Sequence, residues 1–117
     1  MQPDDLAQAL SPKIGDRLIG VEPFAGMAGR VRFRPEVALD VFRTVRDTLG
    51  FHHLSMVGGI DWVDHREVFY VVWSDEVRQY ALLSTDLPAD HPHVESASPI
   101  WPSANWHERE TWELVDI

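Results

Sequence analysis

The segment EVFYVVWS, at 67–74, constrains the fold of this chain more than any other stretch of its sequence. Its centre is apolar at odd and even positions alike, so a strand formed here carries apolar side chains on both of its faces. Turn-forming pairs stand on either side of it, Asp64-His65 before and Asp75-Glu76 after. We therefore expect a strand that is central in a sheet or covered on both faces.

The segments around it alternate between strand and helix patterns. Four further strands are expected at 16–22, 30–34, 53–63 and 78–86. A helix is expected from Pro35 to Leu49, because valines recur every four residues, proline opens the segment and Gly50 follows it. Two more helices are expected, a short one at 3–10 and one that closes the chain. This order, α-β(2)-α-β(3)-α, predicts an α+β fold, a two-layer α/β sandwich whose mixed sheet carries its helices on one face.

The size and charge of the chain limit the classes of function that it can serve. With 117 residues it is expected to form one domain over 1–117, and its net charge of −9 argues against binding nucleic acid. It has no cysteine, so it offers no thiolate ligands for zinc or for an iron–sulfur cluster. No apolar run is long enough to span a membrane, and no secretory signal is visible, so we expect a cytoplasmic protein.

Histidines, acids and glycines offer candidate sites, and none of them forms a catalytic pattern. DHPHVE at 90–95 has a His-x-His spacing that could hold a metal, but it lies in a loop and no second cluster accompanies it. Asp61 and Asp64 flank a turn, where aspartate is common for backbone reasons. Gly58-Gly59 inside a strand marks a bulge or a close backbone approach rather than a phosphate loop. We predict no catalytic, cofactor-binding or metal-ligating residue.

The closing segment differs from an ordinary surface helix, because its apolar and charged residues are interleaved around the helix axis. Asn105 with Glu108 three residues later resembles a capping box, and Arg109 can reach Glu113 four residues on. Glu108 and Glu110 would then need partners from elsewhere, since an unpaired buried charge is costly. We expect a helix contacted by its own sheet and by another chain, the alternative being an exposed helix with stray aromatics.

This closing segment resembles the signature of the thirty-kilodalton subunit (C subunit) family of NADH:quinone oxidoreductase, the respiratory complex I. Relatives occur in F420H2 dehydrogenases and in energy-converting hydrogenases. Asp116 departs from the family pattern, which has glycine there. The resemblance covers about 35–117. Its matching residues are Leu54, Asp61, Tyr70, Pro92, Val94, Ser96, Trp101, Trp106, Glu108, Arg109, Glu110, Glu113 and Ile117.

The resemblance implies a non-catalytic structural and assembly subunit of the complex's hydrophilic arm. Such a subunit packs against the forty-nine-kilodalton chain (the D subunit) and the twenty-kilodalton chain (the B subunit). It is peripheral on the inner face of the cell membrane and has no membrane span. The family's C-terminal tail is absent from this sequence, as in a trimmed chain or one part of a fusion of the C and D subunits. The interface is expected at the signature residues, which are Trp106, Glu108, Arg109, Glu110, Trp112, Glu113 and Ile117.

Three alternatives stay open at this point. The chain could belong to a related hydrogenase or F420H2 dehydrogenase, because other subunits choose the electron donor. It could be a stand-alone domain that binds a metal or a small molecule through 90–95. It could also be a free-standing α+β adaptor that shares only the helix pattern.

Overall fold

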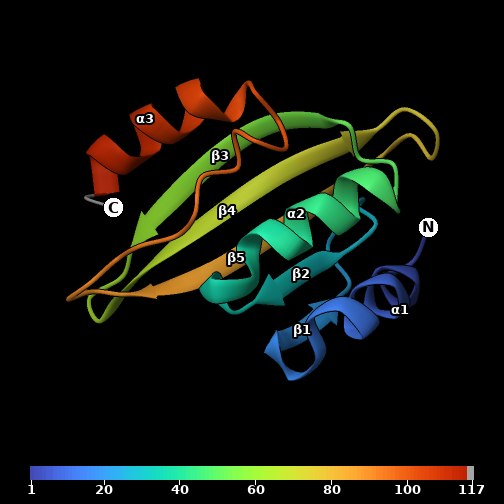
Figure 1. The fold of residues 1–117 in the computed structure, drawn as a ribbon, viewed down its shortest axis with the longest axis horizontal. Coiled ribbons are helices and arrows are strands. Elements are labelled where there is room, and N and C mark those ends of the chain that lie inside the picture. The colour runs from blue at the N-terminus through green and yellow to red at the C-terminus, as the bar shows by residue number, and fades with distance from the viewer. Residues whose placement is uncertain (116–117) are drawn as a thin grey trace.

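The structure is a computed structural model that describes the backbone of residues 1–115 and the side chains of residues 1–112. It contains three α-helices, five strands and two short 3-10 turns, in the predicted order (Figure 1). The helices are α1 (Pro3–Ile14), α2 (Ala38–Asp47) and α3 (Ala104–Val115), and the 3-10 turns are η1 (Gly15–Arg17) and η2 (Pro35–Val37). The strands are β1 (Leu18–Glu22), β2 (Arg30–Phe33), β3 (His53–Asp61), β4 (His65–Ser74) and β5 (Gln79–Pro88).

The five strands form one mixed sheet in the order β1-β2-β5-β4-β3. β2 and β5 run parallel, and the other three neighbouring pairs are antiparallel. β4 pairs with β3 on one side and with β5 on the other along most of its length. The predicted mixed sheet is therefore confirmed, and β4 is an interior strand as its two-sided apolar pattern indicated.

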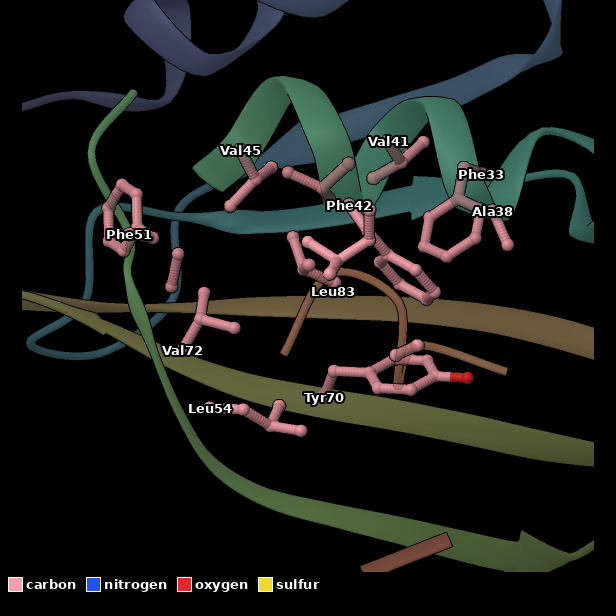
Figure 2. Close-up of a cluster of buried hydrophobic side chains, with 14 of the residues drawn as sticks. Phe33, Ala38, Val41, Phe42, Val45, Phe51, Leu54, Tyr70, Val72 and Leu83 are labelled. Carbon is pink, nitrogen blue, oxygen red and sulfur yellow. The ribbon is translucent and has the colours of Figure 1, made fainter. Parts of the chain in front are cut away.

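All three helices lie on one face of the sheet, and the core fills the space between them and the strands (Figures 1 and 2). Phe42 of α2 is at the centre of this core. Its ring centroid lies 6.1 Å from that of Phe33, 4.7 Å from that of Tyr70 and 5.5 Å from that of Trp101. These aromatic contacts join a strand from each half of the sheet to α2 and to the connection before α3.

α2 follows the predicted apolar spacing, with Val41 and Val45 fully buried against the sheet. Its first predicted turn, Pro35–Val37, is a 3-10 turn rather than α-helix. Gly50 ends the segment with φ 82°, a left-handed conformation that glycine adopts without steric cost. The central helix was therefore predicted correctly except for this first turn and for its end, which lies at Asp47 rather than at Leu49.

α1 is longer than predicted, because it continues through Pro12 to Ile14. The expectation that it ends at residue 10 is wrong. Leu6, Leu10 and Ile14 recur every four residues and are all buried. Burial of this stripe offsets the loss of the one backbone hydrogen bond that a proline cannot donate.

Gly58 lies under the ring of Phe69, its cross-strand partner on β4. A β-carbon at Gly58 would be 2.1 Å from Cζ of Phe69, which is closer than any real contact allows. The bulge suggested for Gly58-Gly59 is not there: the irregular pairing of β3 falls between Leu54 and Met56. Gly58 therefore serves a close approach, by an aromatic ring rather than by backbone.

Candidate functional site

The closing helix α3 lies along β3, where it covers the edge of the sheet (Figure 1). Ala104, Glu108 and Thr111 form the inward side of the helix, and all three are buried. The hydroxyl of Thr111 donates a hydrogen bond of 2.9 Å to the carbonyl of Val57 on β3. This contact ties the helix to an edge strand, whose outward backbone groups would otherwise be open to solvent or to another chain.

Glu108 is only 2% exposed, and its carboxylate is bonded within its own chain. One oxygen accepts a hydrogen bond of 2.6 Å from the hydroxyl of Ser96, and the other accepts a hydrogen bond of 2.7 Å from the backbone N–H of Ala97. Burial raises the pKa of Glu108, and these two hydrogen bonds partly oppose the rise. Glu108 therefore anchors the connection between β5 and α3.

Two sequence-based expectations for Glu108 are corrected by this geometry. The partners that it was expected to need from elsewhere are Ser96 and Ala97, which lie in its own chain rather than in the other chain expected to contact this helix. Glu108 was also expected to complete a capping box with Asn105, but the N–H of Asn105 bonds to the carbonyl of Pro102. The helix begins at Ala104, so Asn105 is already inside it and cannot act as its cap.

Two of the residues that carried the resemblance to the C subunit family, Ser96 and Tyr70, lie close to Glu108. The hydroxyl of Tyr70 is buried without a hydrogen-bond partner among the described residues. Burial and the nearby charge of Glu108 both raise the pKa of Tyr70. The indole N–H of Trp101 donates to the carbonyl of Phe51 at 3.1 Å. This part of the signature therefore holds the connection and α3 onto the sheet.

The outer side of α3 is open. Trp106 is 70% exposed, and Arg109 and Glu110 are exposed. Trp112 is different: it is half-buried and packs against the core, and its indole nitrogen is buried without a hydrogen-bond partner among the described residues. The expected pair between Arg109 and Glu113 lies outside the described side chains, as does Ile117. The structure thus separates the proposed interface residues into an inward group with Glu108 and an outward group around Trp106.

The other candidate residues lie in separate places, the loop after β5 and the turn between β3 and β4. His91 and His93 stack in the loop after β5, and Nε2 of His93 is 3.6 Å from an exposed Glu95 carboxylate. Asp61 pairs with Arg66 at 3.0 Å. Within the described part of the chain, no three histidine, aspartate or glutamate side chains converge as metal ligands would. None of the described helices is long and apolar enough to cross a membrane.

Comparison with known proteins shows which family the chain belongs to. The profile described as "Respiratory-chain NADH dehydrogenase, 30 Kd subunit" matches residues 31–117. The chain belongs to this family. The match includes β2 except for Arg30, all of α2, β3, β4 and β5, and all described residues of α3.

Two relatives of this family member are similar over most of its length. It is 34% identical over 113 residues to the C subunit of NADH-quinone oxidoreductase from Roseiflexus castenholzii, covering 92% of this chain and 64% of that one. It is 35% identical over 99 residues to the C subunit of F(420)H(2) dehydrogenase from Methanosarcina mazei, covering 80% of this chain and 63% of that one. The chain therefore spans less than two thirds of the length of these relatives.

Two solved structures share the fold of this family member. A trypsin-resistant fragment of Nqo5 matches with a TM-score of 0.76 and 21% identity, over 96% of this chain and 92% of that fragment. The membrane-bound sulfane sulfur reductase, an archaeal respiratory membrane complex, has a chain that matches with a TM-score of 0.77 and 18% identity. That match covers 92% of this chain and 63% of the other.

Proposed function

We propose that this chain is a structural and assembly subunit, without catalysis of its own, of a membrane-bound NADH:quinone oxidoreductase. It would lie in the hydrophilic arm, peripheral on the cytoplasmic side of the membrane. Its partners there would be the homologues of the forty-nine-kilodalton D subunit and the twenty-kilodalton B subunit. Family membership and the name of the Roseiflexus relative support this proposal.

The observation that carries the proposal is the outer side of α3. Trp106 leaves 70% of its surface in solvent, beside the exposed side chains of Arg109 and Glu110. Tryptophan and arginine are the residue types that contribute most to protein interfaces, where surrounding contacts exclude water. Glu108, by contrast, is engaged inside the chain and would act by fixing the position of the helix. We propose that Trp106, Arg109 and Glu110 dock against another subunit, with Trp112, Glu113 and Ile117 continuing that interface.

The proposal is tested with Trp106→Ala in the source organism, in the full natural chain. The complex is purified from membranes through a tag on its D subunit, and the amount of this chain that copurifies is measured together with quinone reductase activity. We expect both to fall at least about tenfold, since an interface tryptophan contributes on the order of 2 kcal/mol or more. Val63→Ala, at a fully exposed turn position, is the matched control and should leave both unchanged. Wild-type assembly of Trp106→Ala and of the double change Arg109→Ala, Glu110→Ala would refute docking through α3.

A related parent complex is a second candidate, because the chain is 35% identical to the F(420)H(2) dehydrogenase subunit and 34% identical to the NADH-quinone oxidoreductase subunit. An energy-converting hydrogenase belongs to the same group of alternatives. The electron donor distinguishes them: membranes that contain the assembled complex are supplied with NADH, reduced F420 or hydrogen, and the oxidised donor identifies the parent. A stand-alone metal-binding domain would instead carry a stoichiometric metal in the purified protein.

A further inference from the structure

We propose that the helix-free face of the sheet is a second docking surface, and that it receives a helix of another subunit. This helix would present an uncharged apolar stripe flanked by lysines or arginines. The inference rests on the proposed function, because it places the chain in a complex, but it concerns the face opposite α3. We name this surface the open face; it comprises the outward side chains of β2, β5, β4 and β3.

The open face contains an apolar groove of about 430 Å³. Phe69, Val71 and Leu82 form its floor on β4 and β5. Two walls rise on either side of the floor, one from the connection between β1 and β2 and the other from the end of β3 and its turn. The wall residues are Phe24, Met27, Ile60 and Trp62. A groove of this volume accommodates about two large side chains, such as neighbours one turn apart on a helix.

The apolar surface extends beyond the groove along the same face. Met56 and Tyr80 lie beside it and are exposed, as are Phe24, Ile60 and Trp62. Tyr80 packs against Trp73 with ring centroids 4.6 Å apart. Large apolar side chains gathered on one face of a soluble chain are typical of a surface that another molecule covers.

Every described charge inside the groove is already paired. Glu67 is 9% exposed, and its two oxygens accept from Arg30 at 3.0 Å and from the indole N–H of Trp62 at 3.1 Å. This pair of bonds also holds the Trp62 ring over the groove. A charged group brought into the groove would find no free counter-charge there and would lose its hydration, so the contacting stripe must be uncharged.

The border of the open face is acidic. Glu22, Asp64, Asp75 and Asp86 are all exposed on the strand ends and turns around it. Two of these acids pair with arginines of β2 that face the same way: Arg30 lies 3.4 Å from Glu22, and Arg32 lies 3.7 Å from Asp86. Asp64 and Asp75 contact only histidines among the described basic side chains, and the exposed Arg78 shares the turn of Asp75, so the border keeps a small excess of negative charge. Two copies of a chain with net charge −9 would repel each other across this border. Charge complementarity therefore favours a basic-flanked partner over a second copy.

The partner is expected to be a helix because the face offers side chains only. The backbone groups of β4 and β5 are used in the ladders with their neighbours, so a strand could pair only at the edges of the sheet. A helix needs no backbone partners and completes the second layer of a sandwich by laying an apolar stripe on the sheet.

The test places a photoreactive benzophenone amino acid at position 60 or, separately, at position 106, and irradiates the intact complex purified from native membranes. We expect position 60 to couple to a helical peptide of another subunit that carries lysine or arginine beside an apolar stripe. Coupling to a second copy of this chain would overturn the proposal. Coupling to an acidic peptide, or to a peptide with charged residues within its apolar stripe, would overturn it as well. No coupling at position 60 while position 106 couples would also overturn it, and would leave the proposed function standing. Failure of the unmodified chain to copurify with any complex would instead refute the proposed function.

A charge variant gives an independent measurement. Ile60→Glu puts an unpaired carboxylate at the groove wall, and Val63→Glu puts the same charge on the fully exposed turn beside it. We expect Ile60→Glu to reduce copurification at least about tenfold and Val63→Glu to leave it unchanged. Circular dichroism of both variants should match the wild type, because both positions are exposed. Equal copurification of the two variants would overturn the proposal.

Discussion

A single carboxylate, Glu108, determines how the connection after β5 and the helix α3 are attached to the rest of the chain. It receives hydrogen bonds from Ser96 and Ala97, which precede it in the connection between β5 and α3. The backbone N–H of Ala97 has no other acceptor among the described residues once this carboxylate is removed. A buried donor left without an acceptor costs more than the bond itself contributed.

Glu108→Ala is therefore expected to lower the free energy of unfolding by about 1–3 kcal/mol. Glu108→Gln should cost less, because the amide oxygen still accepts from Ala97 and the amide nitrogen can donate to Ser96. Urea unfolding followed by tryptophan fluorescence measures both. Glu110→Ala on the exposed side is the control and should unfold like the wild type; an equal loss for Glu110→Ala would argue against a specific role for Glu108.

The raised pKa of Glu108 predicts a particular pH dependence. The folded chain holds this proton more tightly than the unfolded chain, so the contribution of Glu108 to stability is complete below the ordinary glutamate pKa of about 4.3 and declines as pH rises through the folded value. Exposed acids such as Asp47 and Asp64 have lowered pKa values and act in the opposite direction. These acids are present in both the wild type and Glu108→Gln, so their contributions to the unfolding free energy cancel when the two proteins are compared.

The unfolding free energy of the wild type, relative to that of Glu108→Gln, should therefore fall as the pH rises above the ordinary glutamate pKa of about 4.3. Denaturant midpoints of both proteins, measured at intervals of half a pH unit, give this difference directly. A difference that is flat, or that grows with pH, would contradict the raised pKa.

Gly58 supports a third residue-scale prediction. Gly58→Ala should lower the unfolding free energy by about 1–3 kcal/mol, because the new methyl group occupies the position of the Phe69 ring. In a Phe69→Ala background the same change should cost nothing or stabilise, since alanine is the better strand residue once the ring is gone. Gly20→Ala in β1 meets no atom within 4 Å and serves as the control. Equal effects of Gly58→Ala in the two backgrounds would contradict the close approach.

Among the secondary-structure elements, β4 and β1 occupy opposite situations in the same sheet. β4 is bonded on both sides, whereas β1 is a short edge strand with an irregular pairing between Leu18 and Gly20. Strands at the centre of a core open only with the whole domain, and edge strands open locally.

We therefore expect the amides from Phe69 to Val72 to exchange with solvent at the slowest rates in the chain, near those set by global unfolding. Amides of β1 should exchange at least about a hundredfold faster. This factor follows if the free energy of locally opening β1 is roughly 3 kcal/mol smaller than that of global unfolding. Native-state exchange measured by mass spectrometry or NMR gives both rates. Similar rates in the two strands would contradict their different places in the sheet.

Strands and helices could be predicted from the sequence where their own apolar pattern matches their burial. The burial of a side chain could not be predicted where residues distant in the sequence cause it. β4 and α2 were predicted because a two-sided apolar run and a four-residue apolar spacing are intrinsic to their segments. The helix expected at 3–10 is too short, because α1 continues through Pro12 and buries Ile14 one turn after Leu10. Positions around α3 could be placed on a helical wheel, but nothing local indicated that Glu108 faces inward. The two-sided pattern of β4 likewise could not indicate that the chain covers only one of its faces.

At the scale of the whole molecule, the helices and strands share one core. That core includes residues of all three helices and of all strands except β1, together with the connection between β5 and α3. The radius of gyration is 13.2 Å, the value of about 13 Å expected for one compact domain of this length. We propose on this basis that residues 1–117 form one domain.

One domain predicts one unfolding transition. Far-UV circular dichroism and tryptophan fluorescence should give the same midpoint in urea, although the tryptophans lie in the second half of the chain and α1 in the first. The calorimetric and van't Hoff enthalpies should also agree. Separate midpoints for the two probes would mean that the N-terminal elements unfold on their own.

The parallel pairing of β2 with β5 has a consequence for synthesis of the chain on the ribosome. Arg30 pairs with Leu82, so the edge of the β1–β2 hairpin has no neighbour until α2, β3 and β4 have been made and β5 follows. At translation rates of about 5–20 residues per second, that edge stays unpaired for roughly 3–10 seconds. During this interval the nascent hairpin exposes backbone groups that can recruit a strand from another chain. The alternating arginines of β2, Arg30 and Arg32, are well placed to discourage such pairing while the ribosome completes the sheet.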